Sequence, residues 1–61
     1  MRKLYTNITR IAEAKRMTIS EVEQAAGLEQ GEIEKWKKYT PNLDAIFKVQ
    51  AALHVDLTDL V

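Results

Sequence analysis

Apolar residues recur along the chain at intervals of three and four, which is the spacing of one face of an α-helix. The pattern predicts five short helices, over about 4–16, 18–26, 30–38, 43–53 and a last turn after Asp56. The residues predicted to face inward are Leu4, Ile8, Ile11, Ala12, Val22, Ala26, Ile33, Trp36, Leu43, Ile46, Val49, Leu53, Leu57 and Leu60. We therefore expect a compact all-α fold of five helices joined by tight turns.

The predicted ends of these helices carry capping residues. Thr18 followed three residues later by Glu21 forms a capping box, and Ser20 with Glu23 offers a second frame for the same device. Gly27 is expected to end the second helix, because glycine adopts the left-handed conformation without steric cost. Pro41 disfavours helical angles at Thr40 and so ends the third helix.

The next residue, Asn42, is expected to cap the fourth helix, with Asp44 favourably placed in its first turn. Asp56 is expected to cap the last helix.

The short length of the chain, 61 residues, limits it to one domain (1–61) with a small core and no room for a deep substrate cleft. Cysteine is absent, which excludes disulfides and thiolate metal sites, and His54 is the only histidine. No nucleophile–base pair or phosphate-binding glycine loop stands out. We therefore expect a cytoplasmic protein that is not an enzyme, with no metal, cofactor, small-molecule substrate or membrane association.

The net charge is zero, but the charges are unevenly distributed. Residues 1–16 hold five Lys or Arg and one Glu, and residues 35–48 hold four Lys and one Asp. Between them, residues 17–34 hold five Glu and no basic residue. An acidic segment thus separates two basic ones.

The segment of about 18–38 is the most informative part of the sequence. It predicts two short helices joined by a tight turn that contains Gly27, which is the pattern of a helix-turn-helix motif. In that motif the second helix enters the major groove of DNA, and its N-terminal residues reach the base edges. Ile33 and Trp36 are expected to anchor the inner face of this recognition helix, while Gln30, Glu32 and Lys35 stay outside.

At this point the sequence resembles a known family, the Cro and phage-repressor (Xre-type) helix-turn-helix domain, whose fold is lambda-repressor-like. The resemblance covers nearly the whole chain and rests on Thr18–Glu23, Ala26-Gly27-Leu28, Ile33, Pro41 and Leu53–Leu60. The pattern G-L-x-x-G-x-I-x-K-W-x-K-x-x-P over 27–41 resembles a subgroup of this family that is common in Gram-positive bacteria and their prophages.

The resemblance implies functional positions. The positions that would read DNA bases are Gln30, Gly31, Glu32 and Lys35. The positions near DNA phosphates are Thr18, Ile19 (through its backbone N–H), Lys38, Tyr39, Thr40 and Asn42.

The sequence departs from the family pattern at several positions. An Arg on the first helix and a Glu late in the third often form an ion pair in this family, but Ala12 and Lys37 stand here, and Trp36 is expected to supply the packing instead. Glu23 replaces a usually small residue, and Glu29 replaces the usual Ser or Thr cap.

The leading hypothesis is a transcriptional regulator, a repressor by resemblance, that binds a palindromic double-stranded DNA operator. A homodimer through the C-terminal region, with Val55, Leu57 and Val61 supplying apolar surface, would let two domains contact two half-sites. The alternative is a protein-interaction module on the same fold, such as an antirepressor or DNA mimic, because the recognition face is acidic. Salt dependence separates the two, because DNA binding weakens steeply as salt rises.

Overall fold

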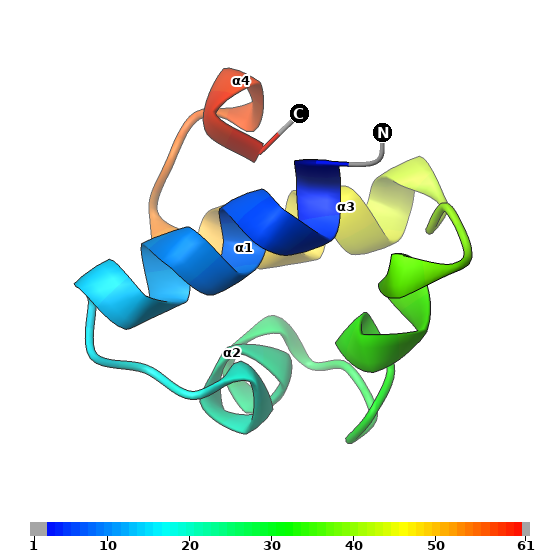
Figure 1. Cartoon of the computed structure of the whole chain (residues 1–61), viewed down its shortest axis with the longest axis horizontal. Helices are drawn as coiled ribbons and strands as arrows, with labels where there is room; N and C mark the ends of the chain where they lie inside the picture. Colours follow the sequence, from blue (N-terminus) through cyan, green and yellow to red (C-terminus); the bar gives the residue numbers. More distant parts are fainter. Residues whose placement is uncertain (1–2, 61) are drawn as a thin grey trace.

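The computed structural model describes residues 3–60 and is helical, with no strand in that range (Figure 1). The elements in order are α1 (Lys3–Ala14), α2 (Ile19–Ala26), the 3₁₀ helix η1 (Ile33–Lys37), α3 (Leu43–Leu53) and α4 (Leu57–Leu60). The all-α prediction is confirmed, but the count of five helices is not matched. Residues 3–60 form four α-helices, and the expected third helix is replaced by a short 3₁₀ helix.

Helix α1 crosses the middle of the molecule, with α3 behind it (Figure 1). Helix α2 packs mainly against α3, while η1 and α4 both pack against α1. In the view of Figure 1, α4 lies above α1, whereas α2 and η1 lie below it. The helix-turn-helix segment and the C-terminal helix are therefore on opposite sides of α1.

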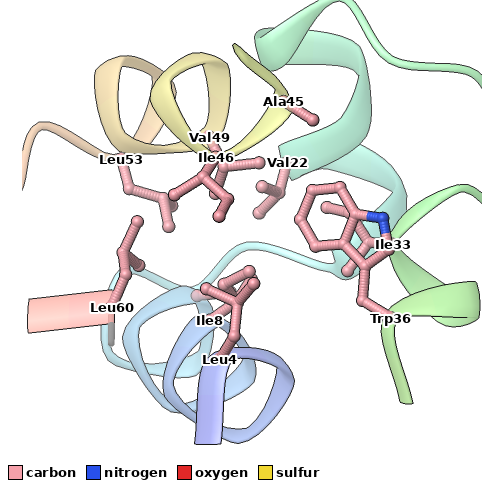
Figure 2. Close-up of a cluster of buried hydrophobic side chains, with 11 residues drawn as sticks. Leu4, Ile8, Val22, Ile33, Trp36, Ala45, Ile46, Val49, Leu53 and Leu60 are labelled. Carbon is pink, nitrogen blue, oxygen red and sulfur yellow. The ribbon is translucent and has the colours of Figure 1, made fainter. Parts of the chain in front are cut away.

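The core lies where these helices meet, and most of the predicted inward positions belong to it. Figure 2 shows Leu4 and Ile8 of α1 pointing toward Ile46 and Val49 of α3. Leu60 closes one end of the cluster, and Trp36, at the other end, is only 8% exposed. The other buried apolar residues are Ala12, Val22, Ile33, Ala45 and Leu53, and Ile11, Ala26, Leu57 and Val55 are partly buried against them.

Leu43 was predicted to face inward, and this is wrong, because its side chain is 56% exposed. Ala45 takes a core position in the first turn of α3 instead. Both residues fit a helical apolar pattern, so periodicity alone does not distinguish them. Leu43 is the first residue of α3, where the stripe of buried residues has not yet begun.

Helix α2 ends at Gly27 as predicted, and two other helices end in the same conformation. Three α-helices end in the same way, with Arg16, Gly27 and His54 in the left-handed conformation. In each case the following residue donates its N–H to a carbonyl five residues back, as Met17 does to Ala12, Leu28 to Glu23, and Val55 to Gln50. This is a Schellman motif, which satisfies the last carbonyls of the helix.

The C-terminal helix is held to the first helix by one side-chain hydrogen bond. The amide Nδ2 of Asn7 on α1 donates to the Leu60 carbonyl at 2.8 Å. Together with the buried Leu60 side chain, this bond fixes α4 on α1. No helix in the described part of the chain is long and apolar enough to span a membrane.

Candidate nucleic-acid interface

Helix α2 begins with the predicted capping box at Thr18. The Thr18 hydroxyl accepts the Glu21 N–H at 3.1 Å, and the Glu21 carboxylate accepts the Thr18 N–H at 2.8 Å. Both halves of the box are present, so the Thr18 frame is correct and the Ser20 frame is not used. The start of the helix-turn-helix is thereby fixed in the register that the sequence indicates.

The recognition segment begins later than predicted. A helix over 30–38 was expected, but regular structure starts at Ile33 and takes the tighter 3₁₀ form through Lys37. Gly31 explains the late start, because its φ of 88° is left-handed and incompatible with a right-handed helix. Glu32, at the N-cap position, makes no side-chain capping hydrogen bond.

The start of η1 is capped by a residue from the preceding helix. Glu23 of α2 is only 2% exposed, and its carboxylate accepts the N–H of Gly31 at 3.1 Å and of Ile33 at 2.9 Å. This role was not predicted: Glu23 was expected either to cap α2 together with Ser20 or to be a departure from a small residue of the family pattern. A signal was available: Glu29 lacks the usual cap chemistry, so an acceptor from elsewhere was needed.

The four predicted base-reading positions lie at the turn and on η1. Gln30 and Gly31 are exposed in the turn, Glu32 is half-buried beside η1, and Lys35 is exposed on η1 itself. A Cβ built on Gly31 would meet nothing within 4 Å. Its surroundings within the domain are therefore open, although its own N–H is engaged by Glu23.

The predicted phosphate positions form two groups. Thr18 and Ile19 lie at the N-terminus of α2, and Lys38, Tyr39, Thr40 and Asn42 connect η1 to the N-terminus of α3. Asn42 caps α3, because its Oδ1 accepts the Ala45 N–H at 2.9 Å. The side chains of Thr18 and Asn42 keep their O–H and N–H₂ donors, and helix N-termini favour anions.

The exposure of the phosphate positions is mostly high. Tyr39 is 68% exposed, and Lys38, Thr40, Asn42 and Thr18 are exposed as well. Ile19 is half-buried, which suits its expected role through the backbone N–H in the first turn of α2.

The three lysines at 35, 37 and 38, on η1 and directly after it, differ in their surroundings. Lys35 and Lys38 are exposed and make no ion pair with any residue between 3 and 60. Lys37 is paired with Glu34 at 2.8 Å, and its ammonium lies 5.2 Å from the centre of the Tyr5 ring on α1. The Glu34 carboxylate raises the pKa of Lys37 above the ordinary 10.5.

Trp36 packs in the core as predicted. It follows the Ile33 anchor by one turn of η1, and the two side chains lie together in Figure 2. The outer face of η1 is consequently the face that carries Lys35, with Gln30 exposed in the turn before it. Within residues 3–60, no group of His, Asp and Glu residues is arranged to hold a metal ion.

Comparison with known proteins identifies the family of this domain. The model of the Cro/C1-type HTH DNA-binding domain matches residues 7–61, which is most of the chain. Comparisons with curated proteins and with solved structures give no match. The helical fold, the capped α2, the Gly27 turn and the anchored segment after it agree with that family. The chain belongs to the Cro/C1-type helix-turn-helix family of DNA-binding transcription regulators.

Proposed function

We propose that this domain represses transcription by binding a palindromic operator, with segment 30–38 in the major groove. The observation that carries this proposal is the two-sided character of the segment. Ile33 and Trp36 are buried, while Gln30, Lys35 and Lys38 are exposed. A segment fixed from behind by two core side chains presents its outer side chains in a constant orientation, as base reading requires.

The roles of the individual residues follow from this placement. Gln30 would pair with adenine, Lys35 with guanine, and Glu32 would accept from a cytosine amino group. Gly31 would let the backbone approach the bases closely, because a Cβ there has only open space around it.

The N-termini of α2 and α3 would bind phosphates on either side of the recognition segment. Thr18 and the Ile19 N–H would act at α2, and Lys38, Tyr39, Thr40 and Asn42 at α3.

The first experiment is selection of genomic fragments by the purified protein at low salt, followed by footprinting of the enriched DNA. A protected palindrome whose affinity falls steeply with added salt supports the proposal. Loss of transcription from a template that carries this site then supports repression. Enrichment of prophage promoters would support membership of the Gram-positive and prophage subgroup. The absence of any enriched fragment at low salt would overturn the DNA-binding proposal.

We further propose that the domain dimerises on the operator through its C-terminal region. Of the three residues expected to supply apolar surface, Val55 and Leu57 are half-buried and packed against the core, so they offer part of that surface, and Val61 lies outside the described residues. Two other apolar side chains, Leu43 and Phe47, are exposed on α3. Analytical ultracentrifugation with operator DNA should show two copies per site, and Phe47→Ser should leave this stoichiometry unchanged. A monomer on DNA would contradict the proposal, and loss of the dimer in Phe47→Ser would place the interface on α3.

The alternative, a protein-interaction module with an acidic recognition face, loses part of its support. Of the five acidic residues between 17 and 34, Glu23 is buried and Glu34 pairs with Lys37, whereas Glu21 stays exposed although it caps α2. Fewer carboxylates therefore remain to define an acidic surface. Binding of a partner protein that is insensitive to salt, together with no binding to DNA, would favour this alternative.

A further inference from the structure

Two carboxylates on α2, two residues apart, cap different elements. Glu21 is exposed and accepts the N–H of Thr18, so it caps the helix to which it belongs. Glu23 is buried and accepts the N–H groups of Gly31 and Ile33, eight and ten residues further along the chain. Glu23 thus connects α2 directly to the start of the recognition segment.

The two hydrogen bonds of Glu23 compensate the cost of burying its carboxylate. A buried carboxylate is strongly destabilising unless hydrogen bonds or an opposite charge compensate it. The ion pairs found within residues 3–60 do not include Glu23. The two backbone N–H groups are therefore its compensation among the described residues. An apolar side chain would fill this site with a smaller desolvation cost, but it would hold neither N–H.

The bound N–H groups alternate along the chain with the exposed Gln30 and the half-buried Glu32. Gly31 and Ile33 donate to Glu23, while Gln30 and Glu32 lie on either side of Gly31. Gly31 has a φ of 88° and carries no Cβ, so no side chain at this position restricts the turn. Ile33 and Trp36 anchor η1 at the core, and the turn before it is held by the Glu23 carboxylate together with the Glu32 N–H, which donates to the Glu29 carbonyl at 3.1 Å, and the packing of Leu28 on the core.

We propose that Glu23 is a positioning residue for DNA recognition, which sets the orientation of Gln30 and Glu32 through the backbone of Gly31 and Ile33. This proposal rests on the proposed function of segment 30–38. It implies that Glu23 acts on the discrimination between operator and unrelated DNA more than on general affinity. General affinity comes from phosphate contacts, which Glu23 does not make.

The test compares Glu23→Gln and Glu23→Ala with two matched controls. Glu23→Gln keeps one acceptor oxygen at similar volume, and Glu23→Ala keeps none. Glu21→Ala removes a cap from the same helix without touching the recognition segment. Glu29→Gln removes one negative charge from the exposed turn. All measurements are made at a temperature where circular dichroism shows the variant folded.

Two readouts are needed, and the first does not depend on DNA. In amide hydrogen exchange, Gly31 and Ile33 should exchange at least about tenfold faster in Glu23→Ala, as loss of a hydrogen bond to a charged group implies. Glu23→Gln should lie between Glu23→Ala and the wild type. Neither control should change these two amides. Unchanged exchange of both amides in Glu23→Gln would overturn the proposal even if Glu23→Ala does not fold.

The second readout is the ratio of operator affinity to affinity for unrelated DNA. The ratio should fall at least about tenfold in Glu23→Gln. Gln30 or Glu32 would then be misoriented, and the loss of one base contact lowers operator affinity by about this factor. The ratio should stay constant in Glu21→Ala and Glu29→Gln. A lower melting temperature of Glu23→Gln with an unchanged affinity ratio would contradict the proposal, because Glu23 would then only stabilise the fold. If the wild type binds no operator, the proposed function fails, while the exchange data still report whether the carboxylate holds the turn.

Discussion

The ammonium group of Lys37 lies 5.2 Å from the centre of the Tyr5 ring, and so joins η1 to α1. This is the position at which the usual ion pair between the first and third helices is missing, since Ala12 and Lys37 stand there. In this structure the cation–π contact links η1 to α1, and the Trp36 ring of η1 is buried in the core to which α1 also contributes.

The first prediction concerns the titration of Lys37. Its pKa is raised above 10.5 because it donates a hydrogen bond to the Glu34 carboxylate and interacts with its charge. The small stabilisation that results is fully present below the unfolded pKa, and it is lost as the pH rises through the higher folded pKa. NMR of the Lys37 side chain should show this late titration. Glu34→Gln should lower the pKa toward its ordinary value, because Glu34 is the largest cause of the shift, and no change in this variant would contradict the assignment.

A second prediction separates base reading from phosphate binding. Gln30→Ala should lose preference at one base position of the operator, by about 1–3 kcal/mol if the contact is bidentate. Lys38→Ala should weaken binding to all DNA about equally and reduce the salt slope by about one. Lys48→Ala, a lysine of α3 paired with Asp44, is the matched control and should do neither. Operator binding like that of the wild type in both variants would refute these roles.

A third prediction uses the left-handed ends of the helices. His54 has a φ of 56°, which costs a residue with a Cβ roughly 1–2 kcal/mol. Glycine removes this strain but loses about 0.5–1 kcal/mol in chain entropy. His54→Gly should therefore raise the free energy of unfolding by up to about 1.5 kcal/mol in urea melts, and should not lower it.

Gly27→Ala is the opposite control for His54→Gly. A Cβ at Gly27 meets no atom within 4 Å, so only backbone strain should act, and the variant should be less stable. A destabilised His54→Gly would show that the imidazole makes a compensating interaction.

A fourth prediction compares two apolar residues of different burial. Ile33 is fully buried, and Ile33→Val should cost about 0.5–1.5 kcal/mol of unfolding free energy. Phe47 is 46% exposed, and Phe47→Ala should change stability by no more than about 0.5 kcal/mol. Chemical denaturation of both variants checks this difference. A loss at Phe47 as large as that at Ile33 would mean that its ring supports the core.

Local signals in the sequence predicted most of the fold. Thr18, Gly27 and Asn42 act on neighbouring backbone groups, so their roles can be deduced from a few residues. The buried positions of α1 were also correct, because a helix in the middle of the domain buries a regular stripe. The prediction that Leu43 is buried was wrong, because periodicity does not indicate at which residue of a helix burial begins.

The recognition segment was less predictable, because two of its determinants are not local. The left-handed Gly31 prevents a helix over 30–32, although glycine at that position is not in itself a break. The capping acceptor comes from Glu23, eight residues before Gly31; the absent cap at Glu29 indicates that an acceptor is needed but not which residue supplies it. The base and phosphate positions stay predictions, since they rest on the resemblance and on exposure alone.

The hydrogen bonds of Glu23 to the backbone affect how the DNA sequence preference of this domain could be changed. The carboxylate binds backbone N–H groups, which every residue except proline possesses. The turn can therefore keep its shape whatever side chains stand at 30, 32 and 35. Libraries randomised at these three positions, with Glu23, Gly31 and Ile33 held constant, should yield folded domains with new operator preferences. The base-reading side chains of this domain can therefore change without a change in the backbone that carries them.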